Sequence, residues 1–343
     1  MRYLNAPIHI FIALSKTSIE VIFICTAVSL NEKAHLFGRT LDLEYSHNES
    51  VAIVPRGFEL KFLHESAIGS YAIIGACHIA NGVPLFYDGM NERGLCMAAL
   101  SFPNFARYTD VRGGMINVAS FELIPFILRQ CADLKSALSL FKRINVTGES
   151  YSSDLPCTEL HWIIADKSGS YVLEPTENGL EIHENPFGVL TNAPNFSYHK
   201  INVCNYISLD SYQPKSTLCK NVELKPYSRG MGAQGLCGDF SSASRFVRAL
   251  FVKEHLSQSE NEINDFFSIL GAVSIPNGCV KTDTGKDVCT VYTSCCHTQS
   301  RNYYFTTKEC QRISCVRMND VNLDSSTLFA YKMKQGNEYK YLN

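Results

Sequence analysis

The sequence predicts an α+β fold, with two antiparallel β-sheets packed face to face and helices on their outer sides. Short apolar runs of the kind found in strands alternate along the chain with stretches whose apolar residues recur at helical spacing. The order is strands, helices, strands, helices and strands, with no internal repeat, low-complexity tract or linker. This order favours a single layered domain around a shared core.

The composition is that of a water-soluble globular protein. Of the 343 residues, 45% are hydrophobic and 19% are charged, and the formal net charge is -2. No basic excess is present to attract nucleic acid or an anionic membrane, and no apolar run reaches the ~18 residues of a membrane-spanning helix. The expected partner is a small polar or amphipathic substrate, with no nucleic acid and no membrane insertion.

The first strand region begins at Cys25 and ends near residue 100. Its apolar runs are separated by turn residues, such as residues 31–33 and 55–57, which connect neighbouring strands in antiparallel order. Residues 88–94 are predicted to form a tight turn and to be structural. The predicted strands are residues 25–30, 35–41, 51–55, 58–63, 71–78, 83–87 and 95–100.

Two helices are predicted after these strands. In residues 117–130 the apolar side chains fall near one helical face, although Pro125 limits or kinks this helix. Asp133 is placed to cap the second helix, whose apolar side includes Leu134 and Phe141. The two helices are expected to form one covering layer.

Strands return at residue 160 and build a second sheet, which two further helices and the C-terminal strands follow. A polar loop is expected at residues 211–238 because it contains two prolines and several glycines. The predicted strands are residues 160–165, 171–174, 180–183, 188–191, 290–294, 303–307, 313–317 and 328–331. The predicted helical segments are residues 199–208, 239–251 and 260–270.

The cysteine pattern disfavours a metal centre. The sequence has 14 cysteines but no C-x-x-C pair, which is the spacing of zinc ribbons and thioredoxin-type motifs. Cys295, Cys296 and His297 form the tightest cluster, but they follow a strand-like run in which adjacent side chains point to opposite faces. Scattered cysteines in a chain with a large core favour a reducing cytoplasm over a disulfide scaffold.

Cys25 is the candidate nucleophile. Its thiol stands in a strand-like run, and the next run brings Arg39 and Asp42 within reach. A neighbouring cation favours the reactive thiolate. The residues alone leave open the alternative that Cys25 is an inert core thiol and that Arg39 and Asp42 form a surface ion pair.

Six segments of the chain together indicate a family. They are residues 25–27 (CTA), 37–42 (FGRTLD), 87–95 (YDGMNERGL), 160–166 (LHWIIAD), 189–196 (VLTNAPNF) and 238–251. In order and in residues they resemble the choloylglycine hydrolases, which include the bile salt hydrolases and penicillin V acylases within the N-terminal nucleophile hydrolase superfamily. The resemblance extends over residues 25–343 and is greatest to the bile salt hydrolases.

This resemblance implies a four-layer αββα sandwich, assembled as a homotetramer, that hydrolyses an amide bond without a metal or organic cofactor. The family's N-terminal cysteine nucleophile corresponds to Cys25, and its arginine and aspartate partners correspond to Arg39 and Asp42. Its oxyanion-hole asparagine corresponds to Asn192, and its second active-site arginine corresponds to Arg245. Without the resemblance, Asn192 would be a turn residue and Arg245 a solvated helix position.

An N-terminal cysteine carries its own base. Its α-amino group has a pKa of about 7.7–8.0, whereas an internal thiol with a pKa of about 8.5 needs a separate base. Cys25 is internal here, so the mature enzyme is predicted to be a single domain of residues 25–343 that lacks residues 1–24. These 24 residues have no coherent signal-peptide pattern, which favours translation from the codon read as Ile24 over cleavage of a leader.

The residue at one position does not decide between the possible substrates. Ser101 stands where bile salt hydrolases usually have asparagine and penicillin V acylases have tyrosine. Its backbone N–H can serve an oxyanion hole equally well, but its side chain matches neither group. The expected activity is hydrolysis of glycine- or taurine-conjugated bile acids. The alternatives are a penicillin V acylase and a catalytically silent homologue that binds without cleaving.

Overall fold

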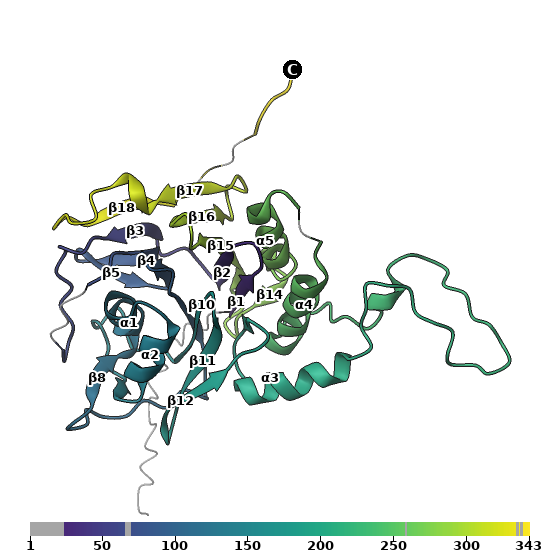
Figure 1. The fold of residues 1–343 in the computed structure, drawn as a ribbon, viewed down its shortest axis with the longest axis horizontal. Coiled ribbons are helices and arrows are strands. Elements are labelled where there is room, and N and C mark those ends of the chain that lie inside the picture. The colour runs from purple at the N-terminus through teal and green to yellow at the C-terminus, as the bar shows by residue number, and fades with distance from the viewer. Residues whose placement is uncertain (1–23, 66–69, 258, 334–335, 337–338) are drawn as a thin grey trace, which may run out of the picture.

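Two β-sheets lie face to face, and helices cover the outer face of each (Figure 1). The structure is a computed structural model that describes residues 24–65, 70–257, 259–333, 336 and 339–343. Helices α4 (Ser242–His255) and α5 (Glu262–Gly271) pack on the first sheet, and α1 (Leu123–Gln130) and α2 (Leu134–Phe141) pack on the second. The predicted four-layer αββα sandwich is confirmed.

The first sheet contains the N-terminal hairpin. Its strand order is β13-β1-β2-β15-β16-β17, with β14 paired to β15, and its pairs are antiparallel. The strands are β1 (Ile24–Asn31), β2 (His35–Leu43), β13 (Val189–Leu190), β14 (Val280–Lys281), β15 (Asp287–His297), β16 (Asn302–Thr307) and β17 (Ser314–Arg317). Every residue of β2 is buried, because the second sheet lies on one face and helices lie on the other.

The second sheet is larger and is also antiparallel. Its order is β12-β11-β10-β7-β6-β4-β3-β18, with β5 paired to β4. The strands are β3 (Ser50–Val54), β4 (Ile73–Ala80), β5 (Val83–Phe86), β6 (Asp88–Asn91), β7 (Cys96–Ser101), β10 (Leu160–Asp166), β11 (Gly169–Thr176), β12 (Gly179–Glu184) and β18 (Phe329–Lys332).

Two apolar cores hold the layers together. One fills the space between the sheets and continues under α4 and α5, where it includes Phe246 and Phe266. The other lies between the second sheet and α1, and it includes Trp162 and Phe126. All four aromatic side chains are buried, and each such burial stabilises the fold by roughly 2–3 kcal/mol. The helices are thereby fixed on the sheets that carry the site.

Side-chain caps determine where four of the described helices begin, and Asn261 is the cap of α5. Asp133 caps α2 in a capping box with Ser136, which confirms the prediction for this residue. Asn195 caps α3 (Phe196–Asn202), and Ser241 caps α4. The start of α4 is important for the site because Arg245 lies in its first turn.

Three predicted elements are wrong. Residues 88–94 are predicted to form a tight turn, but Asp88–Asn91 form the strand β6. Residues 58–63 form no strand, because the guanidinium of Arg129 donates to the carbonyls of Arg56 and Phe58 that a neighbouring strand would need. Residues 117–130 are helical only from Leu123, after a 3-10 turn η1 (Ser120–Glu122). Their first part is a strand, β8 (Ile116–Ala119), which pairs in parallel with β9 (Ile144–Thr147).

The strands are also divided between the sheets differently from the prediction. The sequence groups residues 25–100 in one sheet and residues 160–191 in the other. In the structure β1 and β2 share a sheet with β13 and the C-terminal strands β14 to β17, whereas β3 to β7 share the other sheet with β10 to β12 and β18. This division brings the start of β1 next to segments that are distant in sequence.

One segment extends away from the sandwich, and it is called the arm below. It comprises residues 207–241, follows α3 and η2 (Val203–Tyr206), and ends where α4 begins (Figure 1). Its only regular element is the 3-10 turn η3 (Met231–Ala233). The predicted polar loop at residues 211–238 is confirmed. A further 3-10 turn, η4 (Met318–Asp320), follows β17.

Candidate active site

The β1–β2 hairpin brings three candidate residues together. In its antiparallel register Cys25 pairs with Leu41, and the preceding Ile24 pairs with Asp42. Arg39 lies on the same hairpin, and its Nη2 donates a hydrogen bond to Cys25 Sγ. Cys25, Arg39 and Asp42 are all buried. The structure therefore places a cation and a carboxyl group beside the thiol.

Backbone carbonyls hold the Arg39 guanidinium on its other side. Nη1 donates to Ala99 O and, at 3.2 Å, to Tyr87 O, and Nε donates to Thr40 O at 3.2 Å. Ala99 belongs to β7 and Tyr87 directly precedes β6, so the Arg39 side chain reaches from the first sheet to the second. A guanidinium stays charged at any working pH, which gives the thiol a permanent cationic neighbour.

The Asp42 carboxylate is held by two threonine hydroxyls. Thr290 Oγ1 donates to it at 2.5 Å and Thr40 Oγ1 at 3.1 Å. Burial raises the pKa of Asp42 to about 6, although Arg245 and the two hydroxyls act in the opposite direction. The charge of this group therefore changes close to working pH.

Asn192 and Arg245 lie on the main-chain side of Cys25. Cys25 N donates to Asn192 Oδ1 at 2.9 Å, and Arg245 Nη2 donates to the same oxygen at 2.7 Å. Arg245 Nη1 donates to Thr26 Oγ1 at 2.7 Å and to Cys25 O. Asn192 Nδ2 donates to Ser101 O at 2.9 Å. One network thus includes every candidate residue that the sequence named.

Two of the predicted roles correspond to different contacts in this structure. The sequence assigns the α-amino group of Cys25 to Asp42 and the oxyanion to the side-chain amide of Asn192. In the structure Cys25 N faces Asn192 Oδ1, and Asn192 Nδ2 faces a main-chain carbonyl. Both roles stay predictions, and Asn192 is in contact with the nitrogen that would become the amino terminus.

The surroundings of the Cys25 thiol have opposing effects on its pKa. Burial raises this pKa above its ordinary value, and Asp42 adds to the rise. Arg39 and Arg245 act in the opposite direction, because both guanidinium groups favour the thiolate. The net effect is a raised pKa, so the thiol needs a base while Cys25 N is bound to Ile24 in a peptide bond.

Asp88 is a neighbour of the site that the sequence prediction placed in a turn. It lies in β6, is fully buried, and accepts hydrogen bonds from Tyr292 OH at 2.5 Å and Tyr303 OH at 2.6 Å. Burial raises its pKa, and the nearby Arg39 guanidinium opposes this. The sequence offered one signal, an aspartate inside the family-like segment 87–95, but its tyrosine partners are more than 200 residues away.

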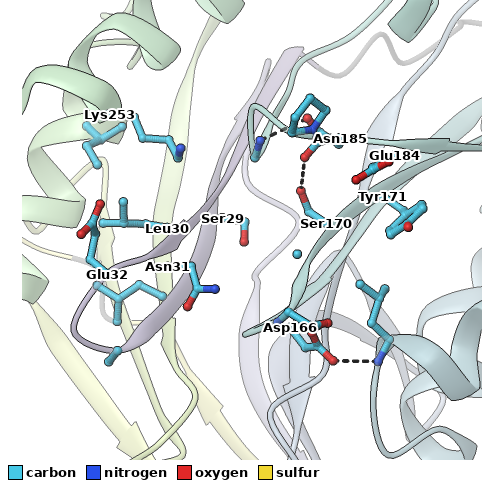
Figure 2. Close-up of a pocket in the computed structure, with 18 of the residues that line it drawn as sticks. Ser29, Leu30, Asn31, Glu32, Asp166, Ser170, Tyr171, Glu184, Asn185 and Lys253 are labelled. Atoms are coloured by element: carbon cyan, nitrogen blue, oxygen red, sulfur yellow. Dashed lines mark hydrogen bonds between the residues drawn. The ribbon is translucent and has the colours of Figure 1, made fainter.

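A separate cavity of about 700 Å³ opens at the opposite end of β1 (Figure 2). Ser29 and Asn31 from the end of β1 line one wall, and Asp166 and Ser170 from the β10–β11 connection line the facing wall. None of the candidate residues lines it, and Cys25 lies at the start of β1. This cavity is therefore not the place where the thiol would meet a substrate.

All 14 cysteines lie in the described part of the chain and have free thiols. Within the described ranges, no group of three or more His, Cys, Asp or Glu side chains is arranged to hold a metal ion. No helix among the described residues is long and apolar enough to cross a membrane.

Comparison with known proteins places this chain in a family. The family model of linear amide C–N hydrolases, choloylglycine hydrolase family, matches residues 25–331. The chain is 39% identical over 323 residues to the bile salt hydrolase/transferase of Lactiplantibacillus plantarum, which covers 93% of this chain and 100% of that protein. It is 34% identical over 329 residues to the bile salt hydrolase/transferase of Clostridium perfringens, with the same two coverages.

Comparison with solved structures agrees with the comparison of sequences. A variant of the conjugated bile acid hydrolase from Clostridium perfringens superposes with a TM-score of 0.88 at 33% identity, over 93% of this chain and 100% of that chain. Penicillin V acylase from Agrobacterium tumefaciens shares the fold, with a TM-score of 0.72 at 19% identity, over 91% of this chain and 95% of that chain. This protein belongs to the choloylglycine hydrolase family of linear amide C–N hydrolases.

Proposed function

We propose that this enzyme is a bile salt hydrolase, which cleaves the amide bond of glycine- or taurine-conjugated bile acids. The observation that carries the proposal is the identity of 39% and 34% to two bile salt hydrolases over their whole lengths. The buried network around Cys25 supports it, because the network supplies the groups that amide hydrolysis through a thiol requires.

The proposed mechanism uses Cys25 as the amino-terminal residue. Its free α-amine takes the thiol proton, and the thiolate attacks the amide carbon of the substrate. The tetrahedral oxyanion collapses as the ammonium returns a proton to the leaving nitrogen of glycine or taurine. Water, deprotonated by the same amine, then hydrolyses the acyl-thioenzyme and releases the bile acid.

Each neighbour has a role in this mechanism. Arg39 and Arg245 favour the thiolate, and Asp42 holds the α-ammonium through charge. Asn192 and the backbone N–H of Ser101 stabilise the oxyanion. The observed bond from Cys25 N to Asn192 Oδ1 supports a further task for Asn192, which is to orient the amine.

The mature enzyme is proposed to begin at Cys25 and to comprise a single domain of residues 25–343. Support comes from the family match, which begins at residue 25, and from the relatives, whose full length corresponds to 93% of this chain. The Ile24–Cys25 bond is either cleaved or never made, if translation begins at the codon read as Ile24.

Penicillin V acylase is the second candidate, because Ser101 matches neither the bile salt hydrolases nor the acylases. Parallel assays of glycocholate, taurocholate and penicillin V on the processed enzyme decide between them. We expect turnover of the two bile salts to exceed that of penicillin V, and the reverse order would overturn the assignment. Cys25→Ala should abolish turnover and leave the circular dichroism spectrum unchanged. If no substrate is turned over, the chain is a silent homologue.

The enzyme is further proposed to be a cytoplasmic homotetramer. The free thiols of all 14 cysteines support a reducing compartment. Apolar side chains on the arm support assembly, because Ile207, Leu218 and Tyr227 are each at least 85% exposed in the single chain.

A further inference from the structure

The peptide segment that carries Asn192 lies between β13 and α3, outside any strand or helix. Thr191 and Asn192 are nevertheless buried, so their backbone polar groups need partners other than water. Each of these two carbonyls lies within hydrogen-bond distance of a histidine side chain. His161 Nε2 lies 2.8 Å from Thr191 O, and His199 Nε2 lies 3.0 Å from Asn192 O. Two consecutive carbonyls are thus bound by two histidines from different elements.

His161 is itself fixed on three sides. It is fully buried in β10, and its ring stacks on Phe102 with centroids 4.3 Å apart and planes 7° apart. Its Nδ1 lies 3.4 Å from Glu174 Oε1. The same carboxylate oxygen accepts from Phe196 N at 2.8 Å at the start of α3. Both ring nitrogens face acceptors, and the contact at Nε2 is the shorter one, so we assign the proton to Nε2, which donates it to Thr191 O.

His199 approaches from α3 and is equally immobilised. It is fully buried, and its ring stacks on Phe246 of α4 with centroids 4.9 Å apart. Burial lowers the pKa of His199 to about 4, so the ring is neutral at working pH and carries one proton. Nδ1 has no hydrogen-bond partner among the described residues, which places the proton on Nε2, where it is donated to Asn192 O.

A hydroxyl from α4 completes the contacts. Asn192 N donates to Ser242 Oγ at 3.0 Å, and Ser242 Oγ lies 2.9 Å from both Thr191 Oγ1 and Asn192 O, to one of which it donates its proton. The backbone of Asn192 is therefore anchored on both its N–H and its C=O, while its side chain faces Cys25 N and Ser101 O. Anchoring the peptide fixes the direction in which the side chain leaves the backbone.

We propose that His161 and His199 are positioning residues, which set the orientation of Asn192 toward Cys25 by binding the carbonyls of Thr191 and Asn192. The inference rests on the proposed amide hydrolysis at Cys25. Neither histidine touches the thiol in the described contacts, so each acts through Asn192. A displacement of about 1 Å in a group that orients the reaction costs on the order of 100-fold in rate.

The test compares variants that keep the ring with variants that keep the donor. His161→Phe and His199→Phe retain the aromatic ring for stacking but lose Nε2, whereas His161→Gln and His199→Gln retain a side-chain N–H. His255 provides a matched control, because it also binds a backbone carbonyl, Phe251 O at 2.8 Å, and stacks on Phe251 at the far end of α4. Alkylation of Cys25 is counted by mass spectrometry of the peptide that contains it, because the other 13 thiols are also free, and circular dichroism checks that each variant is folded.

The phenylalanine variants should lower kcat by about 10- to 100-fold and change KM by less than about threefold. The glutamine variants should restore most of kcat, and His255→Phe should leave both constants unchanged. Wild-type kcat per active site in the phenylalanine variants, or equal losses in phenylalanine and glutamine variants, would overturn the proposal.

A further variant and a substrate assay cover two cases: a histidine variant that does not fold, and a substrate other than a bile salt. If a phenylalanine variant does not fold, Ser242→Ala removes another anchor of the same peptide at the start of α4, and the same loss confined to kcat is expected. An unchanged kcat in that variant counts against the proposal. The wild type is assayed first on glycocholate, taurocholate and penicillin V. Turnover of penicillin V alone refutes the bile salt assignment while the histidine variants still test the positioning role.

Discussion

Cys25 combines a fully buried thiol with two guanidinium groups, and this combination explains why its backbone nitrogen is decisive. Burial disfavours the thiolate, and Arg39 and Arg245 only partly offset this effect. A free amine at Cys25 would supply the missing base next to the sulfur. The same nitrogen already lies 2.9 Å from Asn192 Oδ1, so an amine released there would meet an acceptor in place.

Asn192 is the residue whose loss should be most specific to the chemistry. Asn192→Ala removes the acceptor for Cys25 N and the side-chain amide that we propose as a donor to the oxyanion, so kcat should fall by roughly 100- to 1000-fold. Asn195→Ala is the control, because this residue caps α3 without touching the site. It should lower the free energy of unfolding by about 1 kcal/mol and leave kcat unchanged. Steady-state kinetics and urea unfolding measure the two effects, and similar kcat values for the two variants would contradict this role.

Asp42 should make stability depend on pH in chains that retain Ile24. Its pKa is about 6 in the fold against an ordinary 3.8, so the folded chain binds the proton more tightly than the unfolded chain. The resulting stabilisation is complete below pH 3.8 and is lost as pH rises through about 6. It amounts to at most about 3 kcal/mol.

Urea unfolding between pH 3.5 and 7 checks this dependence. Compared with the full-length chain, Asp42→Asn should show a flatter decline in the free energy of unfolding as pH rises. Identical pH slopes would rule out Asp42 as the titrating group. If processing frees the Cys25 amine as proposed, a nearby ammonium should lower the pKa of Asp42, and the difference between the two proteins should shrink.

The sequence could identify part of this site on physical grounds and part only by resemblance. A short hairpin between two strand-like runs is enough to bring Arg39 and Asp42 to Cys25. Asn192 and Arg245 are more than 160 residues away from Cys25, and only the family resemblance pointed to them. His161 and His199 were missed because their task is to bind backbone carbonyls, and no sequence pattern shows which carbonyls a fold leaves unpaired.

At the scale of elements, local sequence signals predicted individual helices and strands well. They did not predict which strands pair when those strands are distant in sequence. The cap at Asp133 and the apolar runs of β1, β2 and β10 were sufficient to locate those elements. The sequence contains no comparable signal for which strands pair across the chain, so the division of strands between the sheets was wrong. Residues 58–63 resemble a strand in composition, but Arg129 occupies the carbonyls of this region.

Gly38 shows how tightly β2 and β15 approach each other behind Arg39. A Cβ built at Gly38 would lie 1.9 Å from Ser294 O, a backbone atom that cannot move away without breaking the sheet. Gly38→Ala should therefore lower the free energy of unfolding by about 2–3 kcal/mol or more and reduce activity through Arg39. Gly271→Ala, at the end of α5 with nothing within 4 Å, should be neutral or stabilise by up to about 1 kcal/mol. Equal stabilities of the two variants in urea would contradict this packing.

At the scale of the whole molecule, the arm (residues 207–241) exposes apolar side chains that the packing of a single chain does not explain. It extends from the sandwich and exposes apolar side chains, among them Ile207 at 90% and Leu218 at 85% (Figure 1). This exposure supports the proposal that another subunit covers the arm. The arm lies outside both apolar cores, so substitutions there should act on assembly before they act on folding.

The double variant Ile207→Asp with Leu218→Asp should reduce the molar mass of the protein in solution from that of a tetramer to that of a smaller species. Light scattering coupled to size-exclusion chromatography measures this mass. Leu63→Asp is the control, because Leu63 is 54% exposed and lies outside the arm, and it should leave the mass unchanged. A wild-type protein that is monomeric at micromolar concentration would contradict the assembly proposal itself.

The most direct test of the account is the amino terminus of the active enzyme. The protein is produced from its full coding sequence, purified by activity on glycocholate, and examined by intact mass and amino-terminal sequencing. Active molecules are expected to begin with Cys25, and a chain with Ile24 still attached is expected to have no measurable turnover. Full activity in molecules that retain Ile24 would contradict an amino-terminal nucleophile at Cys25.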